Sequence, residues 1–311
     1  MLLRESAGEA VKVAVRQPVQ RRLSAVVPFL LILPGFAFVA AFTIYPILSV
    51  FYHSLMRQNL AHPTPSWIGL GNFADMIHDP LFRESFVNTV LYVVLVVPAA
   101  VVIGLLIAML VNQSTAVGAF LRTTFFYPIV LPLVSVASVW LFVMTPEYGL
   151  LSKVTQTLHI GELALLRSPG TALIALAIVG IWRQAGFYAI FLLAGLQGID
   201  REVENAARLD GAGRWHLTWN IRVPLLWPTL IFVLTLAIIN AWQTLDLVYV
   251  MTQGGPSNST DLLLFHIYET QFSFSDTGAA SALSVVFLIV IAAFSAVQIF
   301  VVDRLRGETV A

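Results

Sequence analysis

Long hydrophobic runs dominate this chain, and shorter polar stretches separate them. Six runs carry few charges and have the length of about 20 residues that a helix needs to cross the hydrocarbon core of a bilayer. They lie within residues 26–51, 86–111, 124–144, 172–196, 226–251 and 279–302. The pattern predicts an all-α integral membrane protein with six transmembrane helices.

The first run contains no Asp, Glu, Lys or Arg between Leu23 and Met56. The apolar core of a cleaved signal peptide has roughly 7–15 residues, so this run is too long for one. We therefore expect three parts: a polar tail in residues 1–25, a six-helix domain in residues 26–302, and a short tail in residues 303–311.

Composition agrees with a membrane protein. Of the 311 residues, 58% are hydrophobic and 11% are charged, whereas soluble domains carry roughly 25% charged residues. The net charge of zero gives no support for a nucleic-acid partner. Cysteine is absent, which excludes disulfides, thiolate metal sites and a cysteine nucleophile.

Basic residues are distributed unequally between the two sides that the six runs define, and this asymmetry sets membrane orientation. One side has Arg4, Lys12, Arg16, Arg21, Arg22, Arg122, Arg201, Arg208, Arg214, Arg222, Arg304 and Arg306, and the other has Arg57, Arg83, Lys153 and Arg167. The sequence thus predicts that both termini, and the connection between the fourth and fifth runs, are cytoplasmic.

Two polar residues interrupt the fourth run, namely Arg183 and Gln184. An arginine at the centre of a span costs about 2.5–3.5 kcal/mol on insertion scales, so it usually faces a partner or a water-filled cavity. One interpretation is a substrate route or gate. The other is a structural pair with Asp246 or with a backbone carbonyl.

The fifth run contains Asn240, Trp242, Gln243, Asp246 and Tyr249. At about 100° per residue, a continuous helix would place Trp242, Asp246 and Tyr249 on one stripe with Gln243 beside it. Aromatic faces together with amide and carboxylate groups suit a sugar. Amides between membrane helices also serve simply to hold helices together, and both interpretations remain open.

Prolines in the first and third runs, including Pro128 and Pro132, predict kinks that serve gating or packing. No pair of histidines has ligand spacing on one helix, so we predict no metal site. We find no catalytic constellation and no phosphate-binding Gly-x4-Gly-Lys loop. The chain is therefore expected to be no enzyme and to bind no cofactor.

The external connections are long. The one at residues 57–85 predicts a short surface helix, and those at residues 145–170 and 252–278 either receive an extracytoplasmic partner or cap the bundle. The connection after the fourth run is longer than the usual 2–8 residues. Acidic residues begin it, Asp210-Gly211 divides it into two helical stretches, and Pro224 leads into the fifth run.

This cytoplasmic connection, residues 200–224, has two interpretations. Two short helices at an angle form a rigid lever that docks a soluble partner. Alternatively, the pair rests on lipid headgroups, with Trp215 and Trp219 as anchors.

The pattern Ala206-Ala207, Asp210-Gly211-Ala212 and then Pro224 resembles the "EAA" loop of permease subunits of binding-protein-dependent ABC importers. The resemblance implies a coupling helix between helices 4 and 5 that contacts an ATPase. It assigns that role to Glu202, Glu204, Asn205, Ala206, Ala207, Asp210, Gly211 and Pro224. The family's glutamate before the two alanines is Asn205 here, and Glu204 lies just upstream.

Other segments resemble the carbohydrate branch of that family, in particular its first maltose-type or glycerol-phosphate-type permease. They are residues 68–73, 88–89, 193–197 and 252–256. The resemblance implies import of a sugar, sugar alcohol or phosphoglycerol compound.

The resemblance also implies a complex in a bacterial or archaeal inner membrane. Its other members would be a second permease, two ATPase subunits that hold ATP and Mg, and an extracytoplasmic solute-binding protein, with lipids around the bundle. Competing hypotheses are an ion-driven secondary transporter and a membrane enzyme. The first needs acidic relay residues in several runs, but only Asp246 qualifies.

Overall fold

The computed structural model describes residues 20–112, 116–159, 161 and 163–309. The predicted tail at residues 1–25 lies largely outside these residues. The chain divides into one unit of residues 1–49 and a second of residues 50–311.

The first unit contains helix α1 (Gln20–Val39), a π-helical turn (Ala40–Ile44) and the first residues of α2 (Tyr45–Ser54). Residues 28–54 form an apolar helical segment long enough to cross a membrane, as predicted for the first run. Pro46 follows the π-helical turn, and a proline cannot donate the regular helical hydrogen bond. The local widening of the helix therefore has a cause in the sequence.

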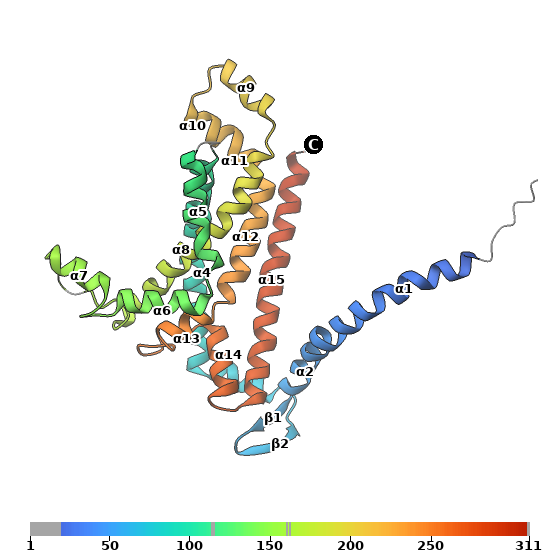
Figure 1. The fold of residues 1–311 in the computed structure, drawn as a ribbon. Coiled ribbons are helices and arrows are strands. Elements are labelled where there is room, and N and C mark those ends of the chain that lie inside the picture. The colour runs from blue at the N-terminus through green and yellow to red at the C-terminus, as the bar shows by residue number, and fades with distance from the viewer. Residues whose placement is uncertain (1–19, 113–115, 160, 162, 310–311) are drawn as a thin grey trace, which may run out of the picture. The chain divides into compact units, whose positions relative to one another are not determined.

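Four long helices run side by side in the second unit (Figure 1). They are α4 (Pro80–Val111), α8 (Pro169–Gln197), α12 (Trp227–Trp242) and α15 (Thr277–Thr309). Small residues allow α4 and α8 to approach closely, as is usual between membrane helices. A Cβ atom on Gly104 of α4 would lie 2.9 Å from the carbonyl oxygen of Ala185 in α8.

The predicted third span is bent, and the kink expected from its prolines lies at Pro132. Helices α5 (Ala116–Val130) and α6 (Leu133–Met144) meet at 101°. Pro132 forms the N-cap of α6 and lacks the N–H group that would continue α5. The described part of the chain has four helices able to span a membrane, or six if each of two bent pairs counts as one span.

One end of the second unit carries an element that the sequence did not predict. Strands β1 (Met56–Asn59) and β2 (His62–Trp67) form an antiparallel hairpin, so the fold is not purely helical. The Asn59 side chain accepts bonds from the N–H groups of Ala61 and His62 at 3.1 and 3.0 Å. This side chain therefore stabilises the turn. The strand was difficult to predict because β2 contains two prolines, which are unusual within strands.

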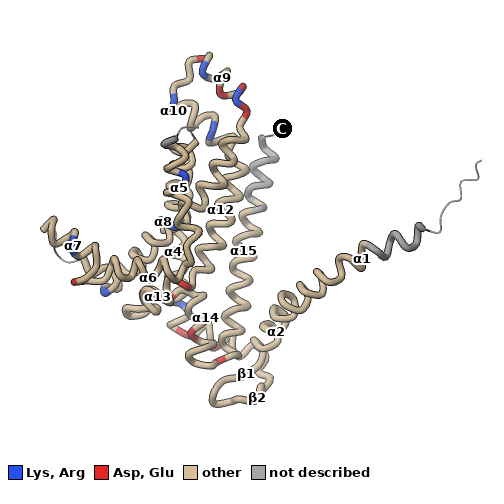
Figure 2. The backbone as a smooth tube through the Cα atoms, viewed as in Figure 1, with Lys and Arg blue, Asp and Glu red and all other residues tan. Residues whose placement is uncertain are grey.

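Short helices complete both ends. Helix α3 (Gly71–His78) confirms the predicted surface helix, and α7 (Leu150–Thr157), α13 (Asp246–Met251) and α14 (Leu263–Phe272) lie in or beside the connections. At the end opposite the hairpin lie α9 (Arg201–Leu209), α10 (Arg214–His216), a π-helical segment η2 (Leu217–Arg222) and α11 (Val223–Leu225). Charged residues gather towards these two ends (Figure 2).

Candidate functional site

A polar pocket lies among α4, α8 and α12, and it brings together four of the seven residues proposed for a substrate route. Arg183 and Gln184 come from α8, Asn240 from α12, and Gln243 from the residue that follows α12. The cavity has a volume of about 170 Å³. Two residues of α8, one residue of α12 and the residue just after α12 thus line a single small space.

Three further polar residues line this pocket, and sequence reasoning missed them. They are Tyr92 of α4, Tyr188 of α8 and Thr244. The side-chain amide of Asn240 donates to the Tyr188 hydroxyl at 3.4 Å. The sequence could have indicated Tyr92, because Asn88 and Thr89 lie four and three residues before it and therefore share one polar face of the helix.

A break in the backbone shapes the pocket wall. Helix α12 ends at Trp242 and α13 begins at Asp246, so residues 243–245 lie outside regular helix. Irregular backbone at membrane depth is tolerated only where protein buries it or a water-filled cavity meets it. Gln243 and Thr244 satisfy this condition because both line the pocket.

Arg183 is the cation of the pocket. Its Nε atom is buried and has no hydrogen-bond partner in the described part of the chain. The ion pairs found among the described residues do not include Arg183 with Asp246. Arg183 thus brings a guanidinium group, which is a hydrogen-bond donor only, to the lining of the pocket.

The other three residues proposed for the substrate route do not line this pocket. The sequence-based prediction assumed one continuous helix past Trp242, but the helix ends there. Trp242 is 1% exposed, and its ring packs 5.9 Å from that of Phe86 and 6.3 Å from that of Phe287. Tyr249 packs on Tyr268 with ring centres 5.4 Å apart. Asp246 is exposed and does not line the pocket.

At the end of the bundle opposite the β-hairpin, residues 200–225 form two helical segments that meet at an angle, which we call the elbow (Figure 1). The Asp200 side chain caps α9 by accepting from the N–H group of Glu202 at 2.9 Å. Gly211 ends α9 with φ of +88°, a conformation that side-chain-bearing residues rarely adopt. Bonds from Gly211 N to Arg208 O and from Ala212 N to Ala207 O complete a Schellman cap.

Most of the elbow is exposed. No residue of α9 is buried, and Leu209 and Trp215 are 89% and 76% exposed. Asn205, which stands in the place of the family's glutamate, is also exposed. Pro224 lies within α11, and the helical stretch 214–225 meets α12 at 69°.

Glu204 is the half-buried charged residue of α9. Its two carboxylate oxygens accept from Nε and Nη2 of Arg222 at 2.7 and 2.8 Å. Arg208 lies 3.9 Å from the same carboxylate. The hydrogen bond from Arg222 and the nearby positive charges hold the pKa of Glu204 below its usual range, against the opposing effect of burial.

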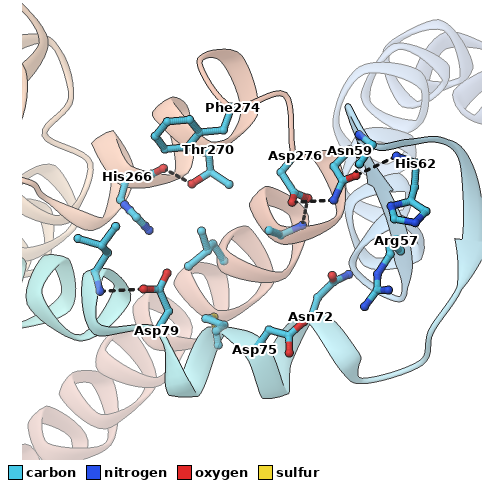
Figure 3. A pocket seen from close by; sticks show the side chains of 15 residues that line it. Arg57, Asn59, His62, Asn72, Asp75, Asp79, His266, Thr270, Phe274 and Asp276 are labelled. Atoms are coloured by element: carbon cyan, nitrogen blue, oxygen red, sulfur yellow. Dashed lines mark hydrogen bonds between the residues drawn. The ribbon is translucent and has the colours of Figure 1, made fainter.

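A larger cavity of about 620 Å³ lies at the hairpin end, with Asp75, Asp79, Asp276, His62 and His266 among its lining residues (Figure 3). Two of its carboxylates already have structural roles. Asp79 caps α4 through the N–H group of Leu81, and Asp276 caps α15 through that of Ala279, each at 2.9 Å. No group of three metal-binding side chains occurs in the described part of the chain.

Asn88 and Thr89 of α4 hold the loop that precedes α14. The Asn88 amide donates to the carbonyl oxygen of Asn258 at 2.9 Å, and the Thr89 hydroxyl accepts from the N–H group of Leu263 at 2.7 Å. The loop they hold contains Gly254, whose φ is +80°. The segment at residues 88–89 thus holds a loop that begins with the segment at residues 252–256.

The solved structures establish the fold. A bacterial ABC transporter involved in the import of the acidic polysaccharide alginate aligns with a TM-score of 0.81, over 91% of this chain and 96% of that chain, at 19% identity. The alginate transporter in complex with an alginate pentasaccharide-bound periplasmic protein aligns with a TM-score of 0.79, over 90% and 95% of the two chains, at 18% identity.

Sequence relatives cover nearly the whole chain. The sulfoquinovosyl glycerol transport system permease protein SmoG of Agrobacterium fabrum is 35% identical over 83% of this chain and 84% of its own length. The trehalose/maltose transport system permease protein MalF of Thermococcus litoralis is 31% identical over 90% and 94%. The sn-glycerol-3-phosphate transport system permease protein UgpA of Agrobacterium fabrum is 28% identical over 90% and 95%.

The family described as binding-protein-dependent transport system inner membrane component matches residues 100–307, which include the pocket residues of α8 and α12 and the whole elbow. The ion-driven secondary transporter finds no support in any of these similarities. This chain belongs to the binding-protein-dependent transport system inner membrane components.

Proposed function

We propose that this chain forms one half of the membrane pathway of an ATP-driven importer for a sugar, sugar alcohol or phosphoglycerol compound. The three relatives named above support this class of solute, since their names specify a glycosyl glycerol, two disaccharides and a glycerol phosphate. All of these compounds carry several hydroxyl groups. The chain itself acts as a transport subunit and hydrolyses no ATP.

The polar pocket in the middle of the bundle carries this proposal. Hydroxyl groups need both donors and acceptors, and Arg183, Gln184, Asn240 and Gln243 offer both kinds. Tyr92 and Tyr188 line the same pocket, and their hydroxyl groups can both donate and accept hydrogen bonds. The broken helix supports the same role, because transporter substrate sites are often built at discontinuous spans.

The size of the pocket supports a second permease. Its volume of about 170 Å³ is below the range of about 300–1,000 Å³ that is typical of ligand sites. A second subunit facing α4, α8 and α12 would enlarge the pocket and complete the pathway. In this proposal the spans of this chain form one half of the solute pathway, and those of the second permease form the other half.

The elbow is the proposed docking element for an ATPase subunit on the cytoplasmic side, and the distribution of basic residues predicts both termini on the same side. Its exposed Leu209 and Trp215 are apolar groups among charged residues, as expected of the central part of a protein interface. The solute-binding protein would dock at the opposite, hairpin end. The alginate transporter solved with its periplasmic protein supports such a partner.

Reconstitution tests the proposal. The chain, its second permease and its ATPase subunits are placed in liposomes with the solute-binding protein, and uptake of labelled trehalose, maltose and glycerol 3-phosphate is measured with and without ATP. We expect uptake of at least one polyhydroxylated solute that requires both ATP and the ATPase subunits. Uptake by this chain alone, driven by an ion gradient, would overturn the proposal.

A further inference from the structure

Among the described residues, side-chain bonds join helix α9 to one residue of another element, Arg222, which lies in the second half of the elbow. In the part of the chain that the structure describes, every side-chain hydrogen bond and ion pair from α9 to another helical element involves Glu204. Because α9 buries no residue, it has no packed face that could fix its orientation. Apart from its two chain connections, the pair with Arg222 is what holds it.

The geometry of this pair favours stiffness. Both guanidinium bonds are short, at 2.7 and 2.8 Å, and a bidentate arginine–carboxylate pair restricts orientation as well as distance. The two side chains are 18% and 21% exposed. They are thus shielded more than a typical surface ion pair, whose contribution is small.

The position of Arg222 near the start of α12 would allow the ion pair to couple movement of α9 to movement of α12. Arg222 is the last residue of η2, and the bend of 69° to α12 follows four residues later, at the boundary between Leu225 and Trp227. Further along, α12 carries Asn240 and ends beside Gln243 in the polar pocket. Glu204 therefore connects the exposed helix of the elbow to the base of a pocket-lining helix.

We propose that the Glu204–Arg222 ion pair is a strut that transmits movement of α9 to α12, and that Glu204 is a positioning residue rather than a contact to the ATPase. This inference rests on the proposed function. The family's glutamate is Asn205 in this chain, and Glu204 does not replace it at the ATPase because its carboxylate is already paired with Arg222. Contacts to the ATPase are left to exposed residues such as Asn205 and Leu209.

The test uses the reconstituted complex and measures two quantities, namely retention of the ATPase subunits and stimulation of ATP hydrolysis by the solute-binding protein. For Glu204→Gln and Arg222→Gln we expect retained ATPase subunits, with stimulation reduced about fivefold, the order of effect of losing a shielded charged pair.

Restoring the link between positions 204 and 222 distinguishes a role in transmitting movement from a role in folding alone. The double variant with Glu204→Arg and Arg222→Glu restores the pair in reverse, and we expect it to recover much of the stimulation. Because the chain has no cysteine, Glu204→Cys with Arg222→Cys can be joined by a short bifunctional thiol reagent. We expect the joined form, and not the unjoined form, to respond to the binding protein.

The outcomes are distinct. Normal stimulation in both single variants would overturn the strut, as would a loss that neither charge reversal nor cross-linking restores. Loss of the ATPase subunits from Glu204→Gln alone would overturn it in favour of direct ATPase contact. If the unaltered chain retains no ATPase subunit at all, the proposed function fails, and not merely the strut.

Discussion

The polar pocket and the elbow differ in what holds them in shape. The pocket is enclosed by packed helices: Tyr92 and Tyr188 are each 1% exposed, and the glycine of α8 at position 180 lies directly against the Tyr92 hydroxyl. Helix α9 of the elbow buries no residue and is held by a helix cap, a glycine and one ion pair. Shape fixes the first region, whereas charge and backbone conformation fix the second.

This difference suits the two tasks. A solute route needs donors and acceptors whose positions do not vary, and close packing around Tyr92 and Asn240 provides that. A docking element has to stay exposed until its partner arrives, so it cannot be held by burying apolar surface. Specific polar contacts and a fixed glycine turn can hold it without such burial.

The largest effect is expected from disturbing the packed region. Gly180→Ala adds a Cβ atom where the Tyr92 hydroxyl lies, and overpacking of this kind costs typically about 1–3 kcal/mol. We expect a lower thermal unfolding temperature in detergent, together with reduced uptake. Gly170→Ala in the same helix is the control, because nothing lies within 4 Å of its added Cβ. Equal unfolding temperatures for the two variants would contradict tight packing at Gly180.

A smaller effect, confined to the elbow, is expected from Gly211→Val. The φ of +88° places a side chain in the left-handed region, at a cost of roughly 1–2 kcal/mol, although there is open space around the position. We expect the chain to stay in the membrane with an unchanged unfolding temperature, while less ATPase co-purifies. Gly213→Ala provides the comparison, since Gly213 has an ordinary φ of −70°. Full ATPase retention by Gly211→Val would count against a fixed elbow.

The sequence predicted the elbow better than the pocket, for a physical reason. The end of α9 at Asp210-Gly211 depends on neighbouring residues alone, so it could be predicted. The break at residues 243–245 contains no glycine or proline, and only tertiary packing produces it. Because of that break, Trp242, Asp246 and Tyr249 do not lie on one continuous helix, whereas Asn240 and Gln243 line one pocket with Arg183 and Gln184.

Contacts over long sequence separations were not predictable in the same way. Glu204 and Arg222 are 18 residues apart, and their meeting depends on the angle between two short helices. The hairpin of β1 and β2 was missed because its signal comes from the Asn59 turn and not from an alternating pattern. Pro132 was recognised as a source of a kink, but its angle of 101° could not be deduced from composition.

A third variant pair compares the observed pocket with the stripe that the sequence alone suggested. Gln243 lines the pocket and Asp246 does not. Removing one hydrogen bond typically costs about 1 kcal/mol, so we expect Gln243→Ala to raise the KM for uptake about fivefold. We expect Asp246→Ala to change the KM less. The reverse order, measured on complexes with equal ATPase content, would favour the stripe over the pocket.

The smallest effect concerns pH and sharpens the contrast between buried and exposed charge. His266 of α14 is 5% exposed, and its Nδ1 lies 3.1 Å from a carboxylate oxygen of Asp261. Burial alone would lower the pKa of His266, but the hydrogen bond and charge of Asp261, with the charges of Asp79 and Glu269, outweigh burial and raise it above 6.5. The protonated pair therefore stabilises the folded state below pH 6.5, and this stabilisation is lost as pH rises through the folded-state pKa.

Glu204 behaves in the opposite sense. Its pKa is lowered in the folded protein, so the stability it contributes is present above its ordinary pKa and is lost as pH falls through the folded value. Between pH 6 and pH 8, unfolding temperatures should thus fall with pH because of His266 and not because of Glu204. His266→Gln should flatten that slope while Glu204→Gln leaves it unchanged. A slope that survives His266→Gln would place the titrating group elsewhere and separate the buried pair from the pH response.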